Sequence, residues 1–456
     1  MTAPLPLRFQ TKLLCFSLLY LFTSLFLALY TYLTATKCII RTHSPESIPK
    51  PLFSYPKAYG QHKYAISTTH SACNSPIRFS DYMVVVEEIQ ELCRNSSHFS
   101  SPLTYLNESA ADTFAGNFSY ERRKSYFHLS DDHKQVPCGF MKDFPIAETD
   151  RAAMEKCNEA VVVSAVFGDH DKIRQPRGLG EITQEMVCFF LFIDNVTLQN
   201  LNSYDILVNS TDEDRLGAWR VVRVLGELPY GNPAMNGVVA KHLIHRLFPN
   251  SKFSIWLDAK LQLTVDPLVL IHSLLLKDNS DMAISKHPFN IHTMEEAIAT
   301  VRWKKWDDVS SLKMQMETYC ENGLEPWSTH KLPYTSDVPD TALILRKHGE
   351  ASNLFSCLLF NELEAFNPRD QLAFAYVRDF MKPRLKINMF ETEVFEHVAM
   401  EYRHNLKRNT KASSSSFPSS SKERLLLKKT KWVTSEAVRV SKCGEYLSRM
   451  WGETHD

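Results

Sequence analysis

The segment SKFSIWLDAKLQLTVDP, Ser251 to Pro267, combines an apolar run with charged residues directly after it. Its large apolar residues from Phe253 to Leu257 predict a strand in the interior of a sheet. The strand ends on an acidic residue, Asp258, and Lys260 follows two positions later. Because ligands bind beyond the carboxyl ends of such strands in open α/β sheets, Asp258 is a candidate site residue. The alternative is a solvated turn in which Asp258 pairs with Lys260.

The neighbouring segments predict how this strand is embedded. Continuous apolar runs in EAVVVSAVFGDHD from Glu159, EMVCFFLFIDN from Glu185 and AWRVVRVLG from Ala218 predict further buried strands. NGVVAKHLIHRLF, which begins at Asn236, predicts a helix. Strands that alternate with helices, several of them ending in Asp, indicate an α/β sheet with a site along one edge. We expect the domain built on this sheet, which would carry the catalytic site, to comprise residues 137–405.

Composition limits the classes of partner. With 456 residues and 44% hydrophobic residues, the chain can bury a large core. Lys plus Arg and Asp plus Glu both number 52, so the net charge is zero and nucleic acid is not expected as a partner. The composition leaves the oligomeric state open.

The N-terminal region predicts the compartment. Residues 13–36 contain no charged side chain, and as a helix they would extend roughly 36 Å, which predicts a transmembrane signal anchor behind a cytosolic tail of residues 1–12. Residues 37–136 are broken by Pro, Ser, Asn and His, which suits a luminal stem. We therefore expect a single-pass type II protein of the endoplasmic reticulum or Golgi membrane. Five candidate glycosylation sites in Asn-X-Ser/Thr triplets favour the same topology: Asn95, Asn107, Asn117, Asn195 and Asn209.

Cysteines and the C-terminal segment complete this outline. Apart from Cys15 in the predicted anchor, nine cysteines remain, and in an oxidising lumen we expect some to pair in an order that the sequence leaves open. Residues 406–456 form a basic, serine-rich tail. Within it, Lys407 to Lys431 carries eight Lys or Arg against one acidic residue. It predicts a flexible linker, with a contact to anionic lipid headgroups as the alternative.

Three loops carry the candidate chemistry. FGDHDKIRQP places Asp169, His170, Lys172 and Arg174 after a predicted strand, where they could hold a diphosphate, coordinate a metal or polarise water. A polar capping loop is the alternative.

The other two loops lie further along the chain. TSDVPDTALILRKHGE brings Asp337 and Asp340 before an apolar strand, and FNPRDQLAFAYV brings Arg369, Asp370 and Gln371 to the start of a predicted helix. There Asp370 could instead cap the helix.

The order of these motifs resembles a known family. From about residue 137 to residue 403, VVVSAVFGDHDKIRQP, FFLFID, HLIHRLFPNSKFSIWLDAKLQLTVDP, PDTALILRKH and NPRDQLAFAYV resemble the plant family that groups mucilage-related probable hexosyltransferases with the turgor-regulation-defect alkaline ceramidase. The resemblance implies a GT-A-like mixed sheet, in which a strand-ending Asp-X-Asp binds a divalent metal on a nucleotide diphosphate. Here Asp258-Ala259-Lys260 supplies one carboxylate and a lysine that could neutralise a phosphate directly. The cofactor is thus open, with a divalent metal at Asp258 as one alternative.

Two enzymatic functions and one non-enzymatic function follow from the resemblance. We place first an alkaline ceramidase that hydrolyses ceramide to sphingosine and a free fatty acid, with a role in sphingolipid metabolism and turgor regulation. The close alternative is a Golgi hexosyltransferase that uses a nucleotide sugar and a glycan acceptor, and the third is a non-catalytic glycan-binding protein. The catalytic candidates are Asp258, Lys260, Asp370, Asp169 and His170, and the substrate-binding candidates are Lys172, Arg174, Asp340, Arg369 and Gln371.

Overall fold

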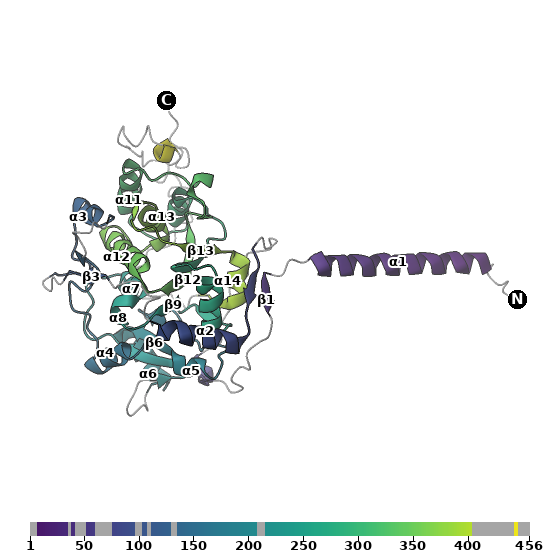
Figure 1. Ribbon diagram of the computed structural model, residues 1–456, viewed down its shortest axis with the longest axis horizontal. Coiled ribbons are helices and arrows are strands. Elements are labelled where there is room, and N and C mark those ends of the chain that lie inside the picture. Colours follow the sequence, from purple (N-terminus) through teal and green to yellow (C-terminus); the bar gives the residue numbers. More distant parts are fainter. Residues whose placement is uncertain are drawn as a thin grey trace, which may run out of the picture.

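An eight-stranded mixed sheet forms the centre of the molecule (Figure 1). The computed structural model describes residues 7–34, 38–41, 52–59, 75–95, 103–106, 111–128, 135–207, 215–403 and 442–445. In spatial order the strands are β13 (Ile387–Phe390), β11 (Met282–Lys286), β12 (Pro339–Lys347), β9 (Phe253–Leu257), β5 (Ala160–Val166), β6 (Val187–Ile193), β8 (Trp219–Arg223) and β7 (Arg215–Leu216).

The apolar runs of the sequence occupy the middle of this sheet. Strands β5, β6 and β9 are parallel and almost wholly buried, as expected for strands covered on both faces. Strand β12 runs antiparallel between β9 and β11. The predicted strand Phe253–Leu257 is confirmed at the predicted residues.

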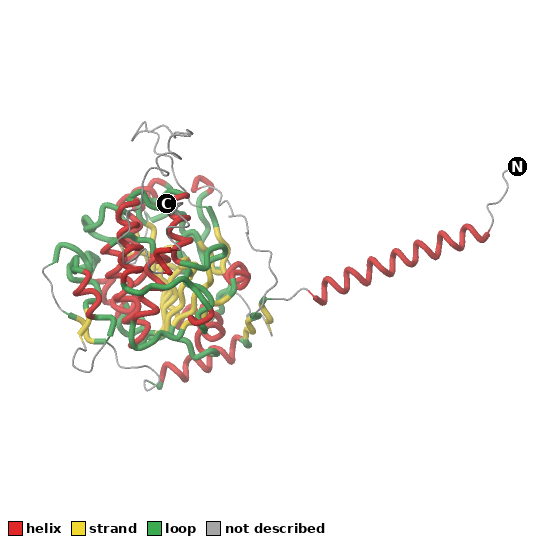
Figure 2. Tube along the Cα trace, turned by 90° about the horizontal axis from the view of Figure 1, so that it is seen from above, coloured by secondary structure: helices red, strands yellow, loops and turns green. Residues whose placement is uncertain are grey.

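Helices cover both faces of the sheet (Figures 1 and 2). Side chains of β5 alternate between the two resulting cores, with Val161 and Val163 on one face and Val162 and Val166 on the other. The first face packs against α4 (Glu148–Glu155), α7 (Pro233–His242), α8 (Ile244–Leu247), α10 (Thr293–Arg302), α11 (Val309–Glu321), α12 (Glu350–Ala365) and α13 (Asp370–Phe380). The second face packs against α2 (Tyr82–Arg94), α5 (Thr183–Met186), α6 (Asn195–Ser203), α9 (Pro267–Ile271), the π-helical turn η3 (His272–Leu276) and α14 (Thr392–Val398).

Short elements surround this body. Strand β10 (Leu261–Leu263), which follows the turn after β9, pairs with β14 (Ala399–Glu401). The others are β1 (Ile39–Arg41), β2 (Ile77–Phe79), β3 (Thr104–Tyr105), β4 (Gln135–Val136), α3 (Tyr120–Ser125) and the 3₁₀ turns η1 (Lys57–Tyr59) and η4 (Thr329–Lys331).

Parts of the predicted stem pack on the domain. The Asp81 carboxylate caps α2 by accepting a hydrogen bond from the Met83 backbone N–H, and Val85 and Ile89 are fully buried against the sheet. Phe114 is also fully buried, in the opposite core. These segments therefore belong to the packed body, while the domain boundary at residue 137 stays a prediction.

The N-terminal helix α1 (Leu7–Thr34) stands clear of the body in both views (Figures 1 and 2). Among the residues that the structure describes, no helix is both long enough and apolar enough to cross a membrane. The predicted anchor over residues 13–36 is therefore not supported. The basic segment of residues 407–431, Asn107 and Asn209 lie outside the described residues, whereas Asn95, Asn117 and Asn195 lie exposed at the surface.

Disulfides join distant parts of the chain, which confirms that some cysteines pair. The bonds are Cys138–Cys357, Cys157–Cys188 and Cys320–Cys443, and Cys38 is also disulfide-bonded. Within the described chain Cys15 and Cys93 are free thiols.

Candidate functional site

A cleft of about 430 Å³ lies at the edge of the sheet where β5 and β9 end and β12 begins. Seven of the ten sequence candidates line it: Asp258, Lys260, Asp370, His170, Asp340, Arg369 and Gln371. Asp171, Lys241 and Thr341 also contribute to its walls. These residues come together because parallel strands bring their carboxyl ends to one edge, while their role as a functional site stays a prediction.

Asp258 is held rigidly at the end of β9. Its backbone N–H donates to the Ala342 carbonyl at 2.8 Å, and its Oδ1 accepts a hydrogen bond from Trp256 Nε1 at 2.6 Å. The side chain keeps 31% exposure, toward the cleft that it lines. Burial raises the pKa of Asp258, and the positive charges of Lys241 and Lys260 act in the opposite direction.

Lys260 points its ammonium toward acidic groups of other elements. Its Nζ lies 2.9 Å from Glu401 Oε1, across the β10–β14 pair. Burial alone would lower the pKa of Lys260, but Asp340 and Glu401 raise it above its usual value. Lys260 therefore stays charged at the cleft, and its recorded ion pair is with Glu401 rather than with Asp258 in a solvated turn.

Asp370 is the first residue of α13 and is only 4% exposed. Its Oδ1 accepts a hydrogen bond from Thr341 Oγ1 at 2.8 Å, and its Oδ2 lies 2.6 Å from Lys241 Nζ. Burial would raise the pKa of Asp370, but Lys241 and His242 hold it well below its usual range. The neighbouring Arg369 occupies the capping position without a side-chain cap bond, so the carboxylate of Asp370 faces the cleft cations instead of capping the helix.

Lys241 is the residue that sequence reasoning missed. It is only 7% exposed on α7, and its Nζ bridges Asp370 at 2.6 Å and Asp258 Oδ1 at 3.8 Å. A signal existed in the sequence, because Lys241 lies three residues after Val238 and therefore on the apolar face of the helix. A lysine on a buried face calls for a partner.

The remaining lining residues differ in how firmly they are held. Arg369 donates to the fully buried Glu296 at 2.6 Å, which fixes the guanidinium at the rim. His170 is exposed, and Gln371 is half-buried. His170 and Gln371 are therefore the side chains with most freedom to meet a ligand.

Three candidates do not line the cleft. Asp169 accepts a hydrogen bond from Asn200 Nδ2 at 2.8 Å, and Lys172 places its ammonium 4.7 Å from the centre of the Tyr59 ring. The buried Arg174 donates to the Ala259 carbonyl at 2.5 Å. Arg174 thus stabilises the turn that carries Asp258 and Lys260 instead of reaching a ligand in this cleft.

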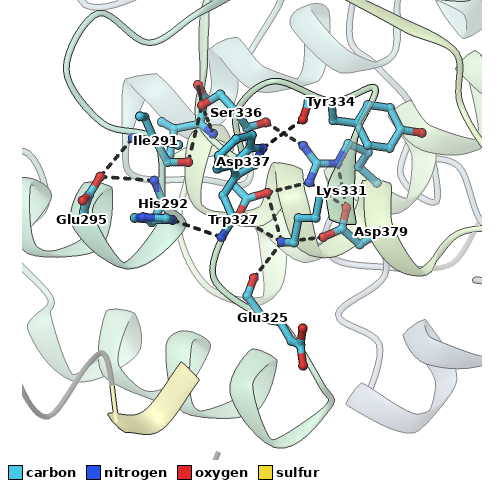
Figure 3. Close-up of polar contacts among 12 residues, drawn as sticks. Ile291, His292, Glu295, Glu325, Trp327, Lys331, Tyr334, Ser336, Asp337 and Asp379 are labelled. Atoms are coloured by element: carbon cyan, nitrogen blue, oxygen red, sulfur yellow. Dashed lines mark hydrogen bonds and ion pairs between the residues drawn. The ribbon is translucent and has the colours of Figure 1, made fainter. Parts of the chain in front are cut away.

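A buried charge cluster fixes the loop that leads into β12 (Figure 3). Figure 3 shows Lys331 between Asp337 and Asp379. Its Nζ lies 3.0 Å from Asp337 Oδ2 and 2.8 Å from Asp379 Oδ2. Arg378, near the end of α13, contacts Asp337 Oδ1 at 2.6 Å, and neither side chain is exposed. The cluster therefore ties the start of β12, with Asp340, to the helix that carries Asp370.

The donor set of the cleft does not fit a dedicated metal site. Among the described residues, one group of three Cys, His, Asp or Glu side chains has ligand atoms close enough to share an ion: Cys138, His245 and Cys357. The two sulfur atoms are joined as a disulfide, so they cannot act as thiolate ligands while that bond is intact. At the cleft Asp258 faces Lys241 and Lys260, whose ammonium groups supply positive charge directly.

The fold is a mixed α/β sheet with a cleft at its strand ends. The family described as TOD1/MUCI70, glycosyltransferase-like domain, matches residues 100–404, and the chain belongs to this family. The predicted resemblance is therefore confirmed, together with its mixed α/β sheet.

Two relatives and one solved structure show the range of this similarity. The chain is 56% identical over 98% of its length to alkaline ceramidase TOD1 of Arabidopsis thaliana, of which it covers 98%. It is 37% identical over 67% of its length to probable hexosyltransferase MUCI70 of the same plant, and it spans 55% of that protein. Mouse xyloside xylosyltransferase 1, apo form, matches 51% of this chain and 85% of its own, with 7% identity and a TM-score of 0.29, which is too low to carry an argument.

Proposed function

We propose that the chain transfers a hexose from a nucleotide sugar to a glycan acceptor in the strand-end cleft. The observation that carries this proposal is the charge of the lining: four Asp, two Lys and one Arg. The cations of this wall suit a diphosphate and its carboxylates suit sugar hydroxyls, whereas the two hydrocarbon chains of ceramide need apolar surface. This preference reverses the order that the resemblance implied, because the cleft supplies charge where a lipid channel would be apolar.

The charged residues divide into roles that glycosyl transfer requires. Lys260 and Arg369 are cations at the cleft that can neutralise the diphosphate as it leaves. Asp370, whose pKa is held low, stays ionised and can stabilise positive charge that develops on the sugar ring. Asp258, whose pKa is raised, is the better candidate to take the proton of the acceptor hydroxyl.

Ceramide hydrolysis is the second candidate function. The observation that favours it is the 56% identity over nearly the full chain to a protein named alkaline ceramidase. In this reaction Asp258, with its raised pKa and its place at the cleft, would activate the attacking water.

One experiment separates the two reactions. The purified full-length protein should be assayed for transfer from a panel of nucleotide sugars and for ceramide hydrolysis, with Asp258→Asn and Lys260→Met beside the wild type. For a transferase, we expect Lys260→Met to weaken nucleotide-sugar binding most and Asp258→Asn to lower turnover about 100-fold or more. Ceramide turnover without nucleotide binding would exclude the transferase. Wild-type turnover in both variants would exclude the cleft as the active site.

We also propose that the domain resides in the lumen of the secretory pathway as a glycoprotein. Support comes from the disulfides, which persist in oxidising compartments, and from the exposed asparagines Asn95, Asn117 and Asn195. Protease protection in sealed membranes and a mass decrease after glycosidase treatment are the expected results. An accessible, unglycosylated domain would contradict this placement.

A further inference from the structure

A second layer of polar groups lies behind Asp370. His242, at the end of α7, is 1% exposed, and its Nε2 lies 3.4 Å from Asp370 Oδ2. Arg346, from β12, is 2% exposed, and its Nη2 lies 3.3 Å from His242 Nδ1. The roles proposed for the cleft give no part to Arg346, and His242 enters them only through its effect on the pKa of Asp370.

The chemistry of arginine determines the protonation of this histidine. A guanidinium carries only donors, so Arg346 must donate its N–H to His242 Nδ1, which therefore acts as an acceptor. A neutral imidazole that accepts at Nδ1 carries its proton on Nε2. That proton is on the nitrogen nearest to the Asp370 carboxylate.

The buried guanidinium of Arg346 has donors without hydrogen-bond partners among the described residues. The Nε and Nη1 of Arg346 are buried and make no hydrogen bond within the described structure. Asp370 is the acidic group whose charge favours the charged form of Arg346. A buried guanidinium with unpaired donors destabilises a fold, so its place behind a cleft carboxylate points to a role there.

We propose that Arg346 is a positioning residue, which acts through the Nε2–H tautomer of His242 to orient the ionised Asp370 carboxylate in the cleft. Thr341 donates to one oxygen of this carboxylate, Lys241 forms an ion pair with the other, and His242 Nε2 lies near that second oxygen without a hydrogen bond. At 3.4 Å the distance between His242 Nε2 and Asp370 Oδ2 is longer than an ordinary hydrogen bond. Catalytic hydrogen bonds are often long in the absence of substrate, and we expect this contact to shorten when substrate binds. The predicted tautomer of His242 does not depend on which reaction the protein catalyses. The predicted effect of Arg346 on turnover rests on the proposed function.

The groups around His242 act on its pKa in opposite directions, and those that lower the pKa dominate. Desolvation lowers the pKa of His242 to about 4, Asp370 raises it, and Arg346 and Lys241 lower it further. The neighbouring His245 is itself kept neutral by burial, which lowers its pKa well below the usual value. His242 is therefore a neutral donor throughout the physiological range.

Nitrogen NMR on full-length protein with ¹⁵N-labelled histidine tests the tautomer directly. We expect the His242 signals of a neutral Nε2–H ring that do not change between pH 5.5 and pH 8, assigned by their loss in His242→Gln. A proton on Nδ1, or a ring that titrates in this range, would overturn the proposal. This readout needs neither turnover nor a substituted Arg346.

A double-mutant cycle tests the effect on turnover. Arg346→Met should lower kcat for glycosyl transfer about tenfold or more with little change in KM for the nucleotide sugar. In His242→Gln, the side-chain amide keeps an N–H near the position of Nε2, and this N–H does not depend on Arg346 for its protonation. Adding Arg346→Met to His242→Gln should therefore cause no further loss of kcat. An equal loss in both backgrounds would contradict the proposal, and thermal unfolding of each variant distinguishes a folding defect. If the protein transfers no sugar, the proposed function fails, while the NMR result still decides the tautomer.

Discussion

Among single residues, Lys241 is the nearly buried cation of the cleft. Its Nζ lies between two carboxylates, and it is nearly buried. We predict that Lys241→Met moves the acid limb of the pH–activity profile to higher pH. The reason is that loss of this charge raises the pKa of Asp370, so the carboxylate becomes protonated at a pH where the wild type stays ionised.

The pH dependence of kcat, measured for both proteins, checks this expectation. Lys156→Met is the matched control, since Lys156 is exposed and does not line the cleft. An unchanged acid limb in Lys241→Met would show that Asp370 does not govern turnover. We also expect the variant to be less stable by about 3–5 kcal/mol, because it leaves a buried carboxylate with one partner fewer.

The lowered pKa values of two buried histidines should make the free energy of unfolding depend on pH. Burial lowers the pKa of His242 to about 4 and that of His348 to about 3, whereas both would titrate near 6.5 in the unfolded chain. Between these values the unfolded chain binds protons that the folded chain does not. The stability that these neutral rings contribute is therefore present above pH 6.5 and is lost as the pH falls toward 4.

Urea unfolding between pH 7.5 and pH 4.5 measures this effect. Each such histidine adds a slope of up to about 1.4 kcal/mol per pH unit in this window. His242→Gln should reduce the slope by up to about 1.4 kcal/mol per pH unit, the contribution of one proton. A slope that is equal in wild type and His242→Gln would contradict the prediction.

At the scale of elements, the buried charge cluster before β12 should be worth more than surface ion pairs. Asp337 is fully buried between Arg378 and Lys331. We predict that Asp337→Asn lowers the free energy of unfolding by about 3–5 kcal/mol, because it leaves the buried Arg378 and Lys331 with the partly exposed Asp379 as their shared carboxylate partner. Asp379→Asn, whose side chain is 19% exposed, is the control and should cost less. Chemical denaturation compares the two, and equal losses would show that burial does not set the cost.

The sequence could predict elements whose signal is local. The run Phe253–Leu257 is wholly apolar and became β9, and the runs after Glu159 and Glu185 became β5 and β6. The helix predicted from Asn236 began earlier, at Pro233, and broke near Leu243 into α7 and α8. Periodicity identified these elements because each buries a continuous apolar face.

Side-chain partners could not be predicted in the same way. Arg174 follows a strand end, as a ligand-binding residue would, but its guanidinium lies buried against the carbonyl of Ala259. Lys241 was overlooked because its partner Asp370 lies 129 positions further along the chain. Contacts of this separation depend on how the layers pack, which a single sequence does not report.

At the scale of the whole molecule, a disulfide ties the C-terminal segment to the domain. Cys443 is fully buried and bonded to Cys320 at the end of α11, 123 positions earlier. A crosslink that closes so long a loop typically stabilises a protein by about 2–4 kcal/mol. Truncation after Asn405 would remove Cys443 and leave Cys320 as a free thiol.

We therefore predict opposite results for two deletions in the C-terminal region. Removal of Lys407 to Lys431 should leave stability and thiol count unchanged if that segment is a linker, whereas truncation after Asn405 should lower the free energy of unfolding by about 2–4 kcal/mol. Cys443→Ser separates the crosslink from the rest of the segment, and it should reproduce most of the loss. Denaturant unfolding and thiol titration give the answer. If truncation does not lower the free energy of unfolding, the Cys320–Cys443 bond does not stabilise the domain. If removal of the basic segment abolishes binding to anionic liposomes, that segment is a headgroup contact rather than a linker.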